Sequence, residues 1–280
     1  MAAESAITAG QRRGENVQRK PSHPSFLGMS FPGEMGTLLA LFAAAAALVG
    51  FAAIADEVLE GETHGFDEAL LLAFRNPADH ADPIGPAWLE IMMRDITALG
   101  STSVLTLVTL IAVGFLLMAR RRGAALLVTL SIAGGTALSL ALKSGFDRPR
   151  PDLVAHLVDV HTLSFPSGHA MLTAVTFLTL GALLARTQRS RRLRAYIVGV
   201  ALFLTLLVGS SRVYLGVHWP TDVLAGWCVG SAWALICWMT ALWLQRRGEI
   251  EPETGTPDSE PVTPALASTP TEGRGGATAK

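Results

Sequence analysis

The sequence has few charged residues: Asp, Glu, Lys and Arg make up only 16% of its 280 residues, whereas 50% are hydrophobic. Its net charge of −1 therefore reflects a scarcity of charges, which is typical of a membrane protein rather than of a balanced polar surface. It has no internal repeat, no glycine-rich nucleotide loop and no nucleic-acid-binding signature, so no nucleic-acid partner is expected. Its two cysteines, Cys228 and Cys237, would lie about 13 Å apart on opposite faces of a helix, which excludes a disulfide or a shared metal.

Six apolar runs approach or reach the length of about 20 residues that a bilayer-spanning helix needs. They cover approximately residues 36–55, 98–118, 124–142, 170–185, 195–210 and 222–244, the fourth and fifth being short. The sequence therefore predicts an all-α fold, a six-transmembrane-helix bundle, in a membrane-embedded domain over residues 35–248. The flanking segments 1–34 and 249–280 are rich in Pro, Gly, Ser, Thr and Glu and predict disordered tails. The first run lacks a convincing cleavage site and is interpreted as a retained helix.

Lys and Arg are distributed unequally among the links between these runs. If the six runs alternate in direction, most of these residues fall on the side that also holds both termini. By the positive-inside rule this side is the cytoplasm, so we expect a multi-pass protein of the plasma (inner) membrane with both termini cytoplasmic. The opposite, extracytoplasmic side receives an acidic link, residues 56–97. Within it, the apolar spacing of residues 66–75 and 88–96 predicts short helices on the membrane surface or over the end of the bundle.

Some basic residues lie on the extracytoplasmic side, against this rule: Arg75, Arg94, Lys143, Arg148, Arg150 and Arg212. Charges near membrane helix ends are costly unless they are used. Three polar segments abut helix ends on this side, and they read KSGFDRPRP (143–151), PSGH (166–169) and SRVYLGVHWPTD (211–222). Their coincidence on one side indicates a functional site, although each alone is more often a loop or a helix cap.

The residue types in these segments suit a phosphate. Lys143, Arg150 and Arg212 supply three cations, and the guanidinium fork matches paired anionic oxygens. Ser167 and Gly168 place a hydroxyl and a backbone N–H at the start of a helix, where anions are favoured. No carboxylate cluster accompanies them to hold a divalent metal, so we expect a phosphate ligand and neither a metal nor another cofactor.

Two histidines complete a possible reaction. His218 is followed by Trp-Pro-Thr-Asp222, and a proline at the first helical position makes Asp222 the third. The Asp222 carboxylate can then reach back, as in a capping box, and accept a proton from one imidazole nitrogen of His218. The other nitrogen becomes a nucleophile toward phosphorus. His169 is available as the general acid for the departing alkoxide, an effect worth about 10² to 10⁴ in rate.

These motifs resemble those of the type 2 phosphatidic acid phosphatase superfamily, whose signature reads K-x6-R-P, P-S-G-H and S-R-x5-H-x3-D. Every motif position matches, from Lys143 to Arg150-Pro151, at 166–169, and from Ser211 to Asp222. The resemblance covers roughly residues 36–244 and implies a six-helix lipid phosphatase with an extracytoplasmic site and no metal. It implies that His218 forms a phosphohistidine, that Asp222 orients it, and that His169 protonates the leaving group and later activates water. It also implies a set of phosphate-binding residues: Lys143, Arg150, Ser167, Gly168 and Arg212.

The expected activity is hydrolysis of a lipid phosphate or diphosphate held in the bilayer, with undecaprenyl diphosphate, phosphatidylglycerol phosphate, phosphatidic acid and lipid A phosphate all open as substrates. Two alternatives have other chemistry. A vanadium-dependent haloperoxidase has a similar pocket, but those relatives are soluble. A non-catalytic lipid-phosphate binding or transport protein would need only the cations and the helix end, not both histidines and Asp222.

Several residues stay open at this level, as does the oligomeric state. His156 and His161 lie between the first two motifs and could contact substrate or nothing. Asp147 and Arg148 lie inside the first motif and could contact the phosphate or headgroup, or form a mutual surface ion pair of little energetic value.

Overall fold

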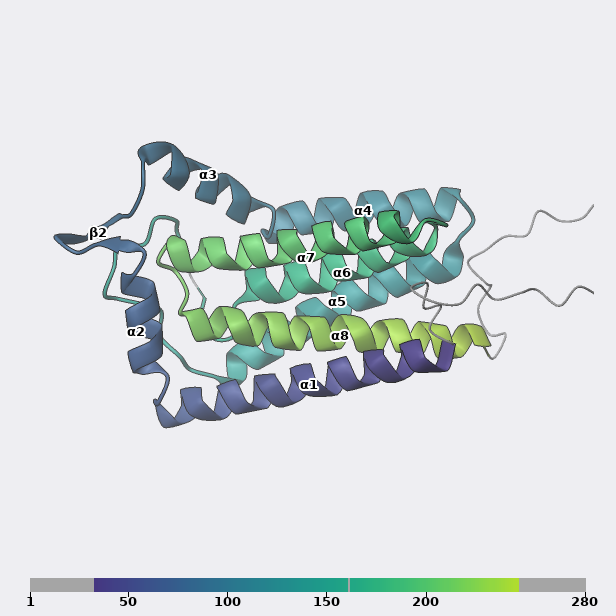
Figure 1. Ribbon diagram of the computed structural model, residues 1–280, viewed down its shortest axis with the longest axis horizontal. Coiled ribbons are helices and arrows are strands. Elements are labelled where there is room, and N and C mark those ends of the chain that lie inside the picture. The colour runs from purple at the N-terminus through teal and green to yellow at the C-terminus, as the bar shows by residue number, and fades with distance from the viewer. Residues whose placement is uncertain (1–32, 161, 247–280) are drawn as a thin grey trace, which may run out of the picture.

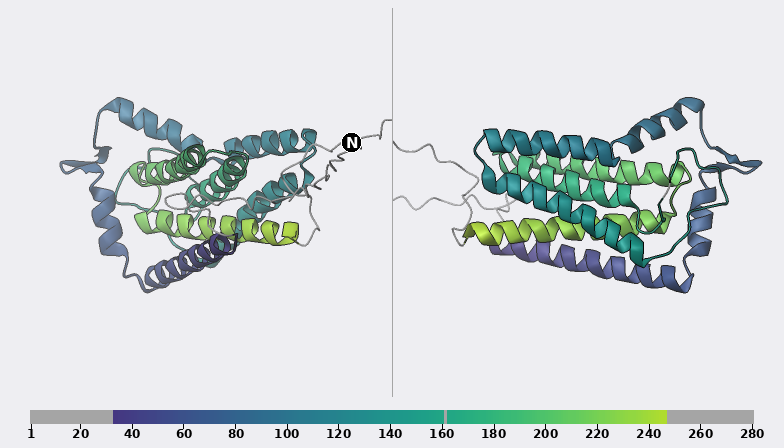
Figure 2. Two further views of the ribbon diagram at one scale, coloured as in Figure 1. Left: turned by 45° about the vertical axis from the view of Figure 1, so that its right-hand side comes forward. Right: turned by 180° about the vertical axis from the view of Figure 1, so that it is seen from behind.

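The structure is a computed structural model that describes residues 33–160 and 162–246 (Figure 1). Its six long helices are α1 (Gly33–Glu60), α4 (Thr102–Met118), α5 (Arg122–Gly145), α6 (Gly168–Arg186), α7 (Arg191–Tyr214) and α8 (Pro220–Arg246). They run side by side, which confirms the all-α bundle expected from the sequence (Figure 2). Apart from residues 33 and 34, which begin α1, both expected disordered tails lie outside the described residues.

Five of these helices, all except α4, are individually long and apolar enough to cross a membrane. α4 has 17 residues and meets that criterion only together with α3 (Ala87–Ala98), from which it is bent by 49°. The expected second span, residues 98–118, thus begins at the end of α3 and continues across the bend. Gly100 lets the bend pack against α7, because a Cβ atom there would lie 2.5 Å from Val208 Cγ1.

The two runs that looked short in the sequence belong to helices of ample length, 19 residues in α6 and 24 in α7. The reason is that polar residues continue the helix beyond the apolar run. α7 begins with Arg191 and Arg192 and ends with Ser211, Arg212, Val213 and Tyr214. Hydropathy alone therefore ended this helix too early, at the place where the third motif begins.

Smaller elements cover one end of the bundle (Figure 1). They are α2 (His64–Leu72), a two-stranded antiparallel hairpin of β1 (Arg75–Asn76) and β2 (Asp79–Pro83), and α3. The short helix expected over 88–96 is confirmed. The helix expected over 66–75 ends three residues early, because the chain turns after Leu72 and Arg75 pairs in β1. α1 begins and α8 ends at the opposite end of the bundle (Figure 2).

Close packing of α6 against α8 brings the second and third motifs together. Gly226 and Gly230 lie four residues apart on α8, and a Cβ atom on them would lie 2.7 Å from Ser167 O and 2.5 Å from Met171 O, respectively. Small residues at this spacing let two membrane helices approach to backbone contact. The backbone N–H of Ser167 also donates to Asp222 O at 2.9 Å. The start of α6 is therefore fixed directly to the start of α8.

Candidate active site

A polar cavity of about 470 Å³ lies at the end of the bundle where α5 and α7 finish and α6 begins. Six of the eight residues expected to form the site line it, namely Lys143, Arg150, Gly168, His169, Arg212 and His218. The other two, Ser167 and Asp222, are fully buried. The three sequence motifs therefore meet at one place.

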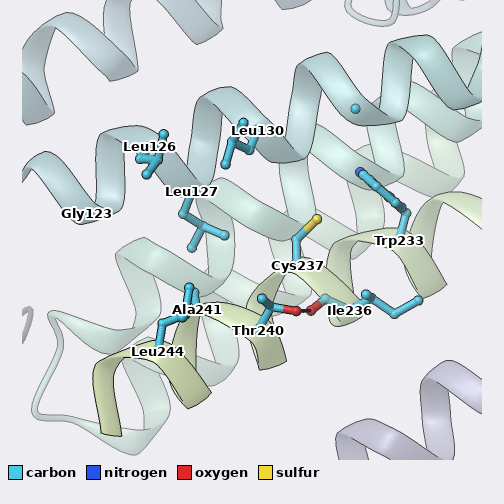
Figure 3. A pocket seen from close by; sticks show the side chains of 11 residues that line it. Gly123, Leu126, Leu127, Leu130, Trp233, Ile236, Cys237, Thr240, Ala241 and Leu244 are labelled. Carbon is cyan, nitrogen blue, oxygen red and sulfur yellow. Dashed lines mark hydrogen bonds between the residues drawn. The ribbon is translucent and has the colours of Figure 1, made fainter. Parts of the chain in front are cut away.

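Another cavity, of about 460 Å³, lies between α5 and α8 in the half of the bundle away from this end (Figure 3). Its lining is apolar apart from Trp233, Cys237 and Thr240, and it includes no Lys, Arg, His, Asp or Glu side chain. It therefore offers no groups for binding or transferring a phosphate, and the polar cavity is the candidate site.

His218 and Asp222 have the relationship expected from their spacing. α8 begins at Pro220, so Asp222 is its third residue, and Asp222 Oδ2 accepts the backbone N–H of Trp219 at 2.9 Å. This is the acidic half of a capping box. The same oxygen lies 3.3 Å from His218 Nδ1 and also accepts a hydrogen bond from the Ser164 hydroxyl. Ser164, two residues before the PSGH motif, is a contact that the sequence reasoning missed.

The hydrogen bonds of His218 define its tautomer. Arg150 Nη1 lies 3.2 Å from His218 Nε2, and a guanidinium can only donate. Nε2 is therefore the acceptor, and the ring proton is on Nδ1, directed to Asp222. Burial lowers the pKa of His218 well below 6.5, and the nearby cations Arg150, Arg212 and Lys143 lower it further. The imidazole is thus neutral, with a lone pair on Nε2 as a nucleophile requires.

The three cavity cations are not neutralised by carboxylates. Lys143 Nζ donates to Leu163 O at 2.6 Å, Arg150 Nε to Thr162 O at 2.7 Å, and Arg212 Nη1 to Thr97 Oγ1 at 3.2 Å. Within residues 33–160 and 162–246, no Asp or Glu forms an ion pair with any of the three. Burial lowers the pKa of Arg150, but a guanidinium remains charged in proteins. Asp159 also lines the cavity, so three cations there face one carboxylate, and the excess of positive charge suits an anion.

The start of α6 provides further donors. Ser167 precedes the helix, yet its side chain forms no capping hydrogen bond. Its Oγ is buried, and so is Arg212 Nε; neither has a hydrogen-bond partner in the described part of the chain. Buried donors in native proteins are normally paired, so both are free for a ligand. Ser167 is thus not the simple helix cap that its position alone would favour.

His169 lines the same cavity from the first turn of α6. It packs against the bend between α3 and α4, because a Cβ atom on Gly100 would lie 3.0 Å from His169 Cδ2. The link before α4 therefore helps to fix the side chain that was predicted to act as general acid.

Arg148 was expected either to contact the phosphate or headgroup or to form a surface ion pair with Asp147, and the structure shows a different set of contacts. Its guanidinium does not pair with Asp147 on the surface, and it is not among the cavity-lining residues. Instead, Arg148 Nη1 donates to Asp222 Oδ1 at 2.7 Å and Arg148 Nη2 donates to Asp67 Oδ2 at 2.6 Å. The sequence reasoning missed Asp67 as a site residue. The one available signal was the charge of Arg148, which lies against the positive-inside rule.

None of the other histidines and arginines within residues 33–160 and 162–246 lines the cavity. His156 Nε2 is hydrogen-bonded to Pro151 O at 2.7 Å and does not line the cavity, whereas His161 lies outside the described residues. Arg75 is buried and donates to Tyr214 O at 2.9 Å, and Arg94 pairs with Glu90 on α3. Of the charges that defied the orientation rule, Lys143, Arg150 and Arg212 are therefore the three at the cavity.

Comparison with known proteins adds independent information. The family model described as the PAP2 superfamily matches residues 124–246, a range that contains all three motifs. Phosphatidylglycerophosphatase B of Bacillus subtilis (strain 168) is 37% identical over 148 residues, which are 51% of this chain and 70% of the relative. An undecaprenyl-diphosphatase of Sulfolobus acidocaldarius is 44% identical over 68 residues, 24% of this chain and 29% of the relative.

A solved structure resembles the fold. The crystal structure of a transmembrane PAP2 type phosphatidylglycerolphosphate phosphatase from Bacillus subtilis superimposes with a TM-score of 0.60 at 28% sequence identity. The match covers 76% of this chain and 97% of that chain. The likeness therefore extends over the bundle and is not confined to the motifs.

Proposed function

The chain belongs to the PAP2 superfamily, and from this premise we propose that it is a membrane phosphatase that hydrolyses a lipid phosphate or diphosphate through a phosphohistidine on His218. The observation that carries the proposal is the state of His218 at the cavity. It is neutral, its Nδ1 proton is directed to Asp222, and its Nε2 is the acceptor atom beside Arg150. A nucleophile and an excess of cationic side chains are therefore combined in one cavity.

In the proposed reaction, Lys143, Arg150 and Arg212 hold the phosphate, together with Ser167 and the N-terminus of α6 with Gly168. His218 Nε2 attacks phosphorus, a P–N bond forms, and the P–O bond to the lipid breaks. His169 donates its proton to the departing alkoxide; a bound phosphate dianion favours the protonated imidazole beforehand. The ring of His218 becomes cationic in the intermediate, and Asp222 stabilises that charge.

The second half of the reaction reverses these roles. Neutral His169 accepts a proton from water, the hydroxyl oxygen attacks phosphorus, and the P–N bond breaks. Inorganic phosphate leaves, while His218 returns to the neutral form with its proton on Nδ1. Atoms and charges balance over the two steps, and His169 ends protonated as it began.

The proposed substrate is a lipid phosphomonoester of the phosphatidylglycerol phosphate type. The support is the relative that matches over 148 residues and bears the name phosphatidylglycerophosphatase B. Undecaprenyl diphosphate is the second candidate, because a relative matching over 68 residues is named for it. Phosphatidic acid and lipid A phosphate complete the panel that we propose to test.

We also propose a plasma-membrane location with both termini cytoplasmic and the site extracytoplasmic. The site segments lie at the end covered by the acidic link with α2 and α3, whereas α5 starts at the opposite end after Arg120 and Arg121 (Figure 1). This distribution follows the positive-inside rule. Single cysteines placed in the β1–β2 hairpin should react with an impermeant maleimide on intact cells; labelling only after lysis would contradict the orientation.

The experiment that tests the function is phosphate release from the lipid panel by protein purified in detergent. His218→Ala and His169→Ala should abolish release, whereas His156→Ala, a histidine substitution away from the cavity, should leave it unchanged. Release that survives His218→Ala would refute the phosphohistidine. Vanadate should inhibit; oxidation of halide on addition of vanadate and peroxide would instead favour the haloperoxidase alternative.

A further inference from the structure

We infer that Arg148 and Asp67 are positioning residues for this reaction: anchored by Asp67 on α2, Arg148 fixes the carboxylate of Asp222 and, through it, the imidazole of His218. The inference rests on the proposed function for its role but on separate contacts for its geometry. Asp67 lies outside the range matched by the family model, residues 124–246.

The two oxygens of Asp222 have different partners. Oδ1 accepts from Arg148 Nη1 at 2.7 Å, whereas Oδ2 accepts from Trp219 N and Ser164 Oγ and faces His218 Nδ1. Arg148 therefore holds the carboxylate by the oxygen that His218 does not use. Rotation of the carboxylate would break the contact with Arg148, so this contact keeps Oδ2 at His218.

Asp67 holds both Arg148 and the first turn of α8. Its Oδ2 accepts from Arg148 Nη2 at 2.6 Å and from Thr221 Oγ1 at 2.6 Å, and its Oδ1 accepts the backbone N–H of Thr221 at 2.9 Å. The Thr221 N–H is one of the unpaired donors at a helix start. Asp67 is fully buried, although α2 is a surface helix that runs across the end of the bundle (Figure 1).

The second carboxylate also matters for charge. Arg148 alone would neutralise Asp222 and remove its attraction for a cationic imidazole. With Asp67 present, the three side chains carry one net negative charge while His218 is neutral. The group becomes neutral overall when the phosphohistidine cation forms. Fixed charges of this kind stabilise the intermediate more than the resting enzyme, which is the condition for accelerating a reaction.

The test compares Arg148→Gln, Asp67→Asn and the conservative Arg148→Lys with Arg94→Gln, which removes an arginine from an exposed ion pair with Glu90. With phosphatidylglycerol phosphate as substrate, kcat should fall about 10²-fold in Arg148→Gln, the loss typical of a misplaced reacting group. KM should stay within about threefold, because Lys143, Arg150 and Arg212 are untouched. Arg148→Lys should recover part of kcat, and Arg94→Gln should match wild type.

A readout that does not need turnover separates this inference from the proposed function. Inorganic vanadate bonds to an imidazole nitrogen in the geometry of the transition state, whereas inorganic phosphate needs only the cations. Calorimetry should show vanadate affinity reduced at least about tenfold in Arg148→Gln and Asp67→Asn, with phosphate affinity unchanged.

If wild type bound both anions as stated but released no phosphate from any lipid, the proposed function would fail and the vanadate comparison would still decide the positioning role. Equal loss of vanadate and phosphate affinity together with a lower Tm would show a purely structural role and overturn the inference. Wild-type kcat and vanadate affinity in Arg148→Gln would overturn it as well.

Discussion

Gly226 offers a quantitative test of how the fold holds the site together. Its substitution by Ala adds a Cβ atom that would lie 2.7 Å from Ser167 O and 3.0 Å from Ala170 Cβ. Real Cβ contacts essentially never fall under 3.0 Å and are tight below 3.4 Å. Because the nearest atom belongs to the backbone, no side-chain rotation can relieve the clash. The starts of α6 and α8 must therefore separate by about 0.3 to 0.7 Å.

This separation acts directly on the candidate site. The Ser167 N–H···Asp222 O hydrogen bond, 2.9 Å long, crosses the same interface. Lengthening it by that amount gives about 3.2 to 3.6 Å, which is at or beyond the limit of a hydrogen bond. His169 on α6 would then shift relative to His218 and Asp222 beside α8. Since a displacement of 1 Å at a reacting group costs about 10²-fold in rate, we expect kcat to fall roughly tenfold.

The same variant should also be less stable by about 1 to 3 kcal/mol, the usual cost of overpacking a filled interior. The assays are phosphate release and thermal unfolding in detergent. Gly114→Ala on α4 and Gly199→Ala on α7 are matched controls, because nothing lies within 4 Å of a Cβ atom at either position. They should keep kcat and gain slightly in stability, as Ala is the better helix former. Wild-type kcat and stability in Gly226→Ala would refute the packing argument.

Three further predictions concern the chemical groups. Asp222→Asn should lower kcat by about 10³-fold with little change in KM, because one amide oxygen cannot serve both Arg148 on one side and Trp219 N and His218 Nδ1 on the other. Either orientation of the amide loses a contact that fixes His218 and its tautomer. A fall in kcat of less than about threefold in Asp222→Asn, with Asp95→Asn as the control, would contradict this. His169→Ala should impair lipid phosphate hydrolysis more than the first step on p-nitrophenyl phosphate, whose leaving group needs no proton. Protein quenched in alkali, in which the P–N bond is stable, should therefore contain trapped phosphohistidine. Because the folded-state pKa of His218 lies below its ordinary 6.5, His218 should stay neutral and nucleophilic below pH 6.5. The free energy of unfolding should fall in the same pH range, because the unfolded chain takes up a proton on this histidine before the folded protein does. A loss of kcat/KM on the acid side with a pKa of 6.5, after correction for substrate ionisation, would argue against this.

The bundle and the cavity were largely readable from the sequence, because their signals are local. Apolar runs define helices, and the three motifs hold their residues at short fixed spacings beside helix ends. His218 and Asp222, four residues apart, are brought together by the helix start itself. Such contacts depend on local geometry, and a single sequence contains it.

The support behind the site was not readable in this way. Asp67 contacts Arg148 and Thr221 across 81 and 154 residues, so no local pattern joins them. On α2, a buried aspartate has the same spacing from apolar neighbours as an exposed one, and the sequence shows Asp67 only as one of the acidic residues of the link 56–97. Ser164 lies in a segment without hydrophobic periodicity. Only the packing of α2 over the end of the bundle shows that these side chains share one buried network.

The form of the cavity favours a substrate that is charged at one end and apolar at the other. Lys143 lies in the last turn of α5, whereas Thr136 and Leu140 line the same cavity from deeper positions on that helix. Lys143 and Thr136 are seven positions apart along the helix, an axial distance of about 10 Å. The Thr136 hydroxyl donates its hydrogen to Ile132 O at 2.8 Å, so that hydrogen is not available to a ligand in the cavity. Because a lipid tail already lies in hydrocarbon, its contacts there are van der Waals packing rather than transfer from water, and they can hold phosphorus against His218 Nε2.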